Sequence, residues 1–279
     1  MLGCWFTTRR REVGIGYGWL LRGTYSILAG AAMYIGFAQT DSSTAEWVRT
    51  WSAAAVVVFC LAGLAQSIVR RRAGVRGQSD EHDRRTDRIA RMTGIERDVV
   101  VEPVGSGTVG PEFSPVLDLI PAVVGLVGVV AAGVASSGEG VGTDAVAVAR
   151  TVVGAVFLGF VSDAMLLGHW YLVQPGLPRR HVNEIVRAFL VVWPVEVAVM
   201  LLPTGMLSVL SGSVDDGWGG QLGWFWVACA VTTGALTWVT LKALKERAYS
   251  AVMAATGLMY LAILTAFGTD LVARAVLSG

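Results

Sequence analysis

AVAVARTVVGAVFLGFVSDAMLLGHWYLV, residues 145–173, is the stretch that decides the fold. A helix needs about 20 mostly apolar residues to cross the hydrocarbon core of a bilayer. This stretch is longer than that, and its ionisable side chains are Arg150, Asp163 and His169. The sequence therefore predicts a membrane-spanning helix that carries an acid deep inside it.

The composition extends this prediction to the whole chain. Of the 279 residues, 54% are hydrophobic and 15% are charged, and the mean hydropathy is +0.58. Soluble domains are about 45–50% apolar and about 25% charged. The 34 glycines suit helices that approach one another closely in lipid. We therefore expect an all-α, polytopic bundle of helices whose partner is the lipid bilayer and not nucleic acid.

Seven segments are predicted to span the membrane. They cover residues 17–39, 47–69, 116–135, 145–173, 185–210, 222–244 and 249–271. The chain thus divides into residues 1–69, with an N-terminal tail and two spans, a basic loop at 70–115, and residues 116–279 with five spans. The first apolar stretch is too long for the core of a secretory signal, so we interpret it as an uncleaved span.

The basic residues predict the orientation of these spans. Of the 22 Lys and Arg residues, Arg22 falls inside a span, 18 fall on one side of the alternating spans, and only three, Arg49, Arg150 and Arg274, fall on the other. Basic residues accumulate on the cytoplasmic side, so we expect a cytoplasmic N-terminus and a C-terminus outside. Arginine far outnumbers lysine in a chain rich in Ala, Val and Gly, which is typical of a high-GC genome. We expect a multi-pass protein of the plasma (inner) membrane of such a bacterium.

Three ionisable residues inside the predicted spans form the main candidate site. Counted from the cytoplasmic ends of their spans at about 1.5 Å per residue, Asp163 and Glu196 lie roughly 15 Å deep, and Arg22 roughly 8–12 Å deep. A buried charge in lipid is costly and marks a functional site by default. We expect a buried polar site in the cytoplasmic half of the membrane, with Arg22 paired to Asp163, Glu196 or both. The alternative is that Arg22 extends to the headgroups while the acids are protonated or face a wet cavity.

Pro194 strengthens the interpretation of Glu196. A proline inside a helix removes one backbone hydrogen bond and favours a kink. The carbonyl freed at a kink needs a polar partner or water when the helix lies in a membrane. The string Trp193-Pro194-Val195-Glu196 therefore favours a cavity beside Glu196 over a lipid-facing position.

The string Gly168-His169-Trp170-Tyr171 ends the fourth predicted span. Trp and Tyr are expected at the membrane–water interface, which accounts for Trp170 and Tyr171. A histidine at this depth can bind a quinone carbonyl, relay a proton or ligate a metal. His169, Trp170 and Tyr171 are thus a candidate interfacial pocket, although interfacial packing is favoured over a ligand role for His169.

Haem and metal sites are disfavoured by the residues present. A membrane b-type haem needs two facing histidines, and the three histidines, His82, His169 and His181, do not fall in facing spans. No zinc motif occurs, so we predict no metal site and no bis-His haem, and we keep a quinone as the cofactor to test.

A polar stripe runs along the sixth predicted span. Thr233, Thr237 and Thr240 share one helical face, and Tyr260 in the seventh span could meet it. In lipid such hydroxyls bond either to the preceding helical turn or to a neighbouring helix. The stripe therefore indicates helix packing, with the lining of a pathway as the alternative.

Three classes of function stay open. A proton-linked or quinone-interacting subunit of a respiratory or redox assembly would use the acids for protons and take electrons from partner subunits. A small-molecule or ion transporter or channel would use Arg22, Asp163 and Glu196 as a gate. A non-catalytic accessory or assembly subunit would pair its charges internally or with a partner's helix. No motif decides whether the protein is an enzyme.

Overall fold

The computed structural model describes residues 2–9, 12–39, 43–70, 114–137, 141–174, 177–246 and 248–277. All regular elements of these residues are helices, as predicted. They are α1 (Leu2–Thr8), α2 (Ile15–Gln39), α3 (Thr44–Val69), the 3-10 turn η2 (Pro115–Asp118), α5 (Leu119–Ala135), α6 (Val141–Val173), α7 (Arg180–Leu201), α8 (Met206–Leu210), α9 (Gln221–Ala243) and α10 (Tyr249–Leu277). The loop predicted at 70–115 falls almost entirely outside the described residues.

Five helices of the described part are long and apolar enough to cross a membrane. They cover Thr44–Val69, Val116–Ala135, Asp144–Val173, Gln221–Ala243 and Ser250–Leu277. Large apolar side chains on their outer faces are strongly exposed, such as Val123 at 61% and Leu264 at 69%. Such faces are stable in lipid and would be costly in water. The chain is therefore a polytopic helical membrane protein.

Two further long helices, α2 and α7, occupy the first and fifth predicted spans. The boundaries of α7 differ from the predicted 185–210. The helix begins five residues earlier, at Arg180, and ends at Leu201, so that Pro203 lies outside it and α8 is a separate short helix. Pro194 lies inside α7, as expected.

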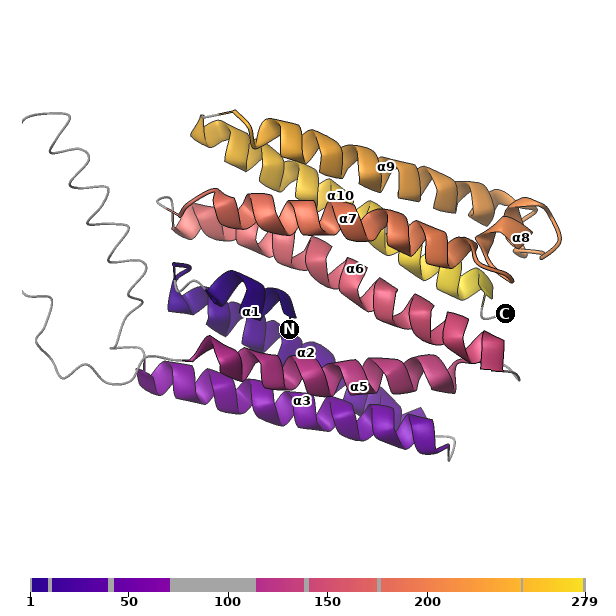
Figure 1. The fold of residues 1–279 in the computed structure, drawn as a ribbon, viewed down its shortest axis with the longest axis horizontal. Coiled ribbons are helices and arrows are strands. Elements are labelled where there is room, and N and C mark those ends of the chain that lie inside the picture. The colour runs from indigo at the N-terminus through magenta and orange to yellow at the C-terminus, as the bar shows by residue number, and fades with distance from the viewer. Residues whose placement is uncertain are drawn as a thin grey trace, which may run out of the picture.

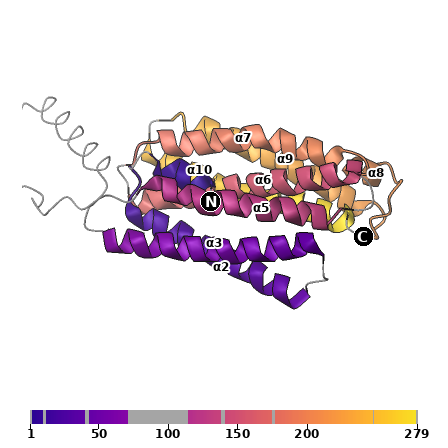
Figure 2. The ribbon, with the colours of Figure 1, turned by 60° about the horizontal axis from the view of Figure 1, so that its bottom comes forward.

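The long helices run side by side and alternate in direction (Figure 1). We call one end of the bundle the Val173 end, because α6 finishes there, and the other the Leu277 end, where α10 finishes. In Figures 1 and 2, α2 and α3 lie on one side and α7 and α9 on the other. The helices α2, α3 and α5 pack together, as do α6, α7, α9 and α10, and α5 against α6 joins the two groups.

Glycine permits the close approach of α5 and α6. A Cβ atom added to Gly133 would lie only 2.6 Å from the Cα atom of Val148, so no larger residue fits at this crossing. Small residues at such crossings let helix backbones approach closely in lipid.

The short helix α1 was not predicted. It contacts η2, α2, α5 and α6, and therefore fills the Val173 half of the seam between the two groups of helices (Figure 1). Cys4 and Thr7 of α1 are 0% and 1% exposed. The sequence Leu2–Phe6 is apolar, but it is far too short to be recognised as a membrane segment.

Candidate functional site

The three ionisable residues predicted to form one site are all buried, but they have different polar partners. Arg22 is 2% exposed, Asp163 1% and Glu196 0%. The expectation of one cluster at similar depth is wrong.

Arg22 pairs with Asp118 and not with the two predicted acids. Its Nε and Nη2 atoms each donate to one carboxylate oxygen of Asp118 at 2.8 Å, and Nη1 lies 3.4 Å from Ser67 Oγ. Gly18 leaves room for the guanidinium, since a Cβ there would lie 2.7 Å from Nη1. This two-pronged geometry is the strongest form of an arginine–carboxylate pair. The burial of Arg22 also excludes extension to the headgroups.

Asp118 was missed because it stands at the boundary of the third predicted span. It belongs to η2, the turn that leads into α5, and is 2% exposed. Since α2, α3 and α5 pack together, the start of α5 is brought to Arg22. A signal existed in the sequence, because Asp118 is the one acid inside the predicted span 116–135.

Asp163 of α6 meets residues from the first 25 positions of the chain. The hydroxyl of Tyr25 donates to Asp163 Oδ1 at 2.5 Å, and the hydroxyl of Tyr17 lies 3.4 Å from its backbone carbonyl oxygen. The carboxylate also packs directly against Gly3 of α1, where any Cβ atom would overlap with Oδ2. The described contacts of Asp163 therefore consist of hydroxyl groups and backbone, without a basic side chain.

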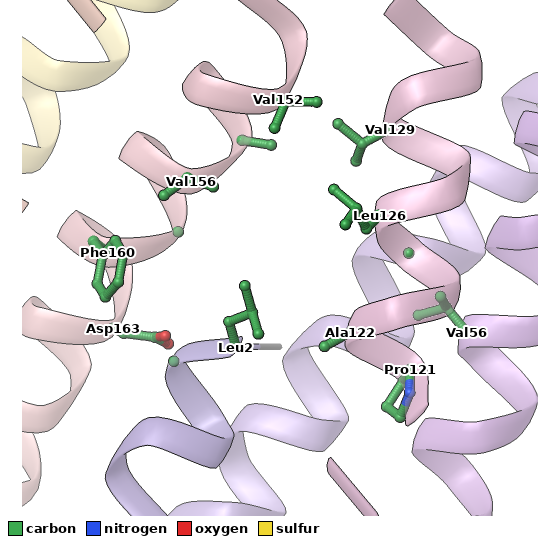
Figure 3. A pocket seen from close by; sticks show the side chains of 14 residues that line it. Leu2, Val56, Pro121, Ala122, Leu126, Val129, Val152, Val156, Phe160 and Asp163 are labelled. Atoms are coloured by element: carbon green, nitrogen blue, oxygen red, sulfur yellow. The ribbon is translucent and has the colours of Figure 1, made fainter. Parts of the chain in front are cut away.

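A pocket with a volume of about 230 Å³ opens beside Asp163. Figure 3 shows it between α5 and α6, with Asp163 and Leu2 at one end. Its lining is apolar apart from this carboxylate and comprises Leu2, Gly3, Val56, Pro121, Ala122, Gly125, Leu126, Val129, Val152, Ala155, Val156, Gly159 and Phe160. A side chain at Gly159 would meet no atom within 4 Å, so the absence of a side chain there helps to keep the pocket open.

Glu196 lies in the other half of the bundle. Its charged neighbours are Asp270 and Arg274, near the end of α10. Gly154 of α6 packs against the same two side chains, because a Cβ there would collide with both. Gly154 precedes Asp163 by nine residues, which separates the two sites by about 13 Å along α6. The prediction placed Glu196 too close to the Val173 end because α7 begins earlier than expected.

The predicted interfacial pocket is dispersed over three environments. Tyr171 is buried, and its hydroxyl donates to the carbonyl oxygen of Pro178 at 2.6 Å. Trp170 packs on Tyr17 with 5.7 Å between ring centroids and donates to Gln174 Oε1. His169 is exposed and lies edge-on to Tyr260. These side chains do not converge on one ligand.

The polar stripe of α9 bonds mainly to its own helix. Thr233, Thr237 and Thr240 donate to the carbonyl oxygens of the residues four positions earlier at 2.7–2.8 Å. Across the interface Thr233 meets Thr265 at 2.8 Å, whereas Tyr260 faces His169 instead. The stripe therefore packs α9 against α10.

The remaining histidine of the described residues, His181, is also engaged. It is 2% exposed, and its Nε2 lies 2.6 Å from Glu12 Oε2. His82 falls outside the described residues. Among residues 2–277, less the undescribed gaps, no group of three His, Cys, Asp or Glu side chains is arranged to hold a metal ion.

Comparison of the chain with protein-family models, curated proteins and solved structures finds no match. The two buried acid sites are therefore the features of the described residues that bear on function.

Proposed function

We propose that the protein is a seven-span plasma-membrane protein that binds a quinone-type ligand in the pocket beside Asp163 and exchanges a proton with it. The proposal includes a cytoplasmic N-terminus and Val173 end. This orientation is supported by the 18 basic residues assigned to that side against three on the other. Asp163 then belongs to the cytoplasmic half of the membrane.

The observation that carries the proposal is a single carboxylate at the end of an otherwise apolar pocket. Binding sites for small molecules are mostly apolar, with a few polar groups that fix the ligand's orientation. A quinone matches this chemistry, because its tail is apolar and its ring carries oxygen atoms. The space between α5 and α6 would hold the ring and the first part of the tail.

Asp163 would act on the ring oxygen. As a carboxylate it accepts a proton from a quinol hydroxyl, and as a carboxylic acid it donates to a quinone carbonyl. The Tyr25 hydroxyl, which donates to Asp163 Oδ1 at 2.5 Å, orients the carboxyl group. The electrons would come from a redox partner subunit, so the protein would be one component of a larger assembly.

The proposal is tested by photoaffinity labelling with an azido-substituted quinone in lipid nanodiscs, followed by peptide mapping. We expect labelled peptides from 119–135 and 141–173. Gly159→Leu fills the pocket and should reduce labelling at least tenfold. Gly257→Leu is the matched control, because Gly257 also has no neighbour within 4 Å but does not line the pocket. Equal labelling of both variants would contradict the proposal.

A proton-linked transporter is the second candidate. It is favoured by one specific observation, namely that buried acids occur at two depths, Asp163 in one half and Glu196 with Asp270 in the other. Proton-driven uptake into proteoliposomes that is lost in both Asp163→Asn and Glu196→Gln would favour this function over quinone binding. If both variants leave labelling and uptake unchanged, an accessory or assembly role is favoured.

A further inference from the structure

Glu196 is a buried acid without a hydrogen-bond donor in the described part of the chain. Its side chain is 0% exposed, and neither Oε1 nor Oε2 has a donor among the described residues. A carboxylate buried without a donor or a counter-ion is strongly unfavourable. Its surroundings must therefore explain how the group is tolerated.

The described hydrogen bonds of the basic residues near Glu196 go to other acceptors. Arg274 Nε lies 2.9 and 2.8 Å from the two oxygens of Asp270, and Arg274 Nη2 donates to the carbonyl oxygen of Arg150. Arg150 in turn donates to the carbonyl oxygens of Val199, Leu202 and Thr204 at the end of α7.

The helix α9 adds no charge at this depth. It carries no acidic or basic residue before Lys242. The group within hydrogen-bonding reach of Glu196 is the Asp270 carboxyl, which is itself an acceptor when ionised.

From this geometry we infer that Glu196 and Asp270 hold one proton between them and form a proton-binding site. The proton bonds to a Glu196 oxygen, and the resulting hydroxyl donates to Asp270. The contacting trio of Glu196, Asp270 and Arg274 is then neutral, whereas loss of the proton to water leaves it with one negative charge. Two carboxyl groups in contact cannot both ionise cheaply, which is the usual reason for such sharing. A metal cation fits less well, because the Arg274 guanidinium already occupies both oxygens of Asp270.

The site is close to the Leu277 end of the bundle. Glu196 lies five residues before the end of α7 at Leu201, about 8 Å along the helix axis. A proton released here has a short path to that surface and not to the opposite one. The inference is independent of the proposed quinone site, which is in the other half of the bundle.

Infrared difference spectroscopy tests this inference on the full chain in nanodiscs. We expect a carbonyl-stretch band of a protonated carboxyl group that shifts in D₂O. Selective ¹³C labelling of Glu side chains should move the band, and this requires no variant. Glu196→Gln should abolish it, while the control Asp163→Asn should leave it in place.

The variant Asp270→Asn distinguishes a proton that Glu196 shares with Asp270 from a proton that burial alone keeps on Glu196. Without the Asp270 charge, Arg274 becomes the counter-ion of Glu196, so Glu196 ionises and the band should disappear although the residue is still present. A band that persists in Asp270→Asn, that does not respond to Glu labelling, or that is absent from the wild-type protein would overturn the inference. Displacement of the band by sodium ions at constant pH would identify a cation site instead.

Discussion

The Arg22–Asp118 pair and the Glu196–Asp270–Arg274 cluster both place ionisable side chains inside the helical bundle, but they differ in how the charges are balanced. In the first, one base meets one acid, both side chains are 3% exposed, and each carboxylate oxygen receives a nitrogen at 2.8 Å. In the second, one arginine lies beside two acids, and Glu196 has no hydrogen-bond donor among the residues that the structure describes. A balanced pair needs nothing further to be stable in a membrane. An unbalanced cluster needs a bound ion, here the proposed proton, to become neutral. A contact that must bind and release an ion can have a function beyond holding the helices together.

Breaking the balanced pair should have the largest effect. Asp118→Asn leaves the buried Arg22 guanidinium without its carboxylate, and loss of one partner of a buried pair costs about 3–5 kcal/mol. Thermal or denaturant unfolding of the detergent-solubilised protein measures this change in the free energy of unfolding.

A double variant shows whether the charges or the packing matter at this pair. Replacing both partners by apolar residues, as in Arg22→Met with Asp118→Leu, should restore most of the lost stability, because no unpaired charge remains. If Asp118→Asn alone is as stable as the wild-type protein, the pair has no structural role and the comparison fails.

The corresponding Asp→Asn change in the Glu196–Asp270–Arg274 cluster should lower the free energy of unfolding by less. Asp270→Asn also removes the partner of an arginine, Arg274, whose side chain is 35% exposed, and Glu196 is close enough to replace Asp270. We expect a loss of about 1–3 kcal/mol, in the range for a hydrogen bond to a charged group. Adding Glu196→Gln to Asp270→Asn removes the replacement and should destabilise the protein by more than the sum of the single changes. An additive result would contradict the idea that Glu196 substitutes for Asp270.

The sequence predicts the long helices and the buried ionisable residues, but only part of how they are arranged. The positions of the long helices follow from apolar runs, because burial in lipid requires uninterrupted length. The chemistry of α9 was also predictable, since threonines in a helix bond back to the preceding turn. Arg22, Asp163 and Glu196 were each recognised as buried for the same reason of apolar context.

The residues that contact Arg22, Asp163 and Glu196 were not predictable, because the length of a helix does not indicate which of its faces packs against which neighbouring helix. Asp118 lies in a turn at the edge of a span, and Gly3 reaches Asp163 only because α1 folds back into the seam. The depth of Glu196 depended on the true start of α7 at Arg180, five residues outside the apolar run. Pairing in a membrane bundle is set by helix packing, which a single sequence encodes only weakly.

The contact between Thr233 and Thr265 involves no charge, so its loss gives a reference for how much the charged contacts contribute to stability. Thr233→Val removes the contact between Thr233 and Thr265 across the α9–α10 interface, and such contacts in membranes are worth about 0.6 kcal/mol on average. Thr237→Val is the matched control, because the described bond of Thr237 stays within its own helix. We expect Thr233→Val to be the more destabilising of the two in unfolding experiments, and equal effects would argue against a role for the contact.

Asp216 contrasts with Glu196, because its carboxylate accepts several backbone hydrogen bonds. Its substitution should have the smallest effect on stability. It lies in the loop before α9, and its oxygens accept from the backbone N–H groups of Trp218, Gly220 and Leu222 at 2.8–2.9 Å. These N–H groups, that of Gly220 foremost, hold the pKa of Asp216 below its usual range. The stabilisation is therefore complete above the unfolded-state pKa of about 4 and is lost as the pH falls through the lower folded-state value. Asp216→Asn keeps one acceptor oxygen, so we expect only a small decrease in melting temperature at about pH 7, which shrinks toward zero as the pH falls below the folded-state pKa of Asp216. A difference that is independent of pH would show that the charge of Asp216 does not contribute, and that its hydrogen bonds alone hold the start of α9.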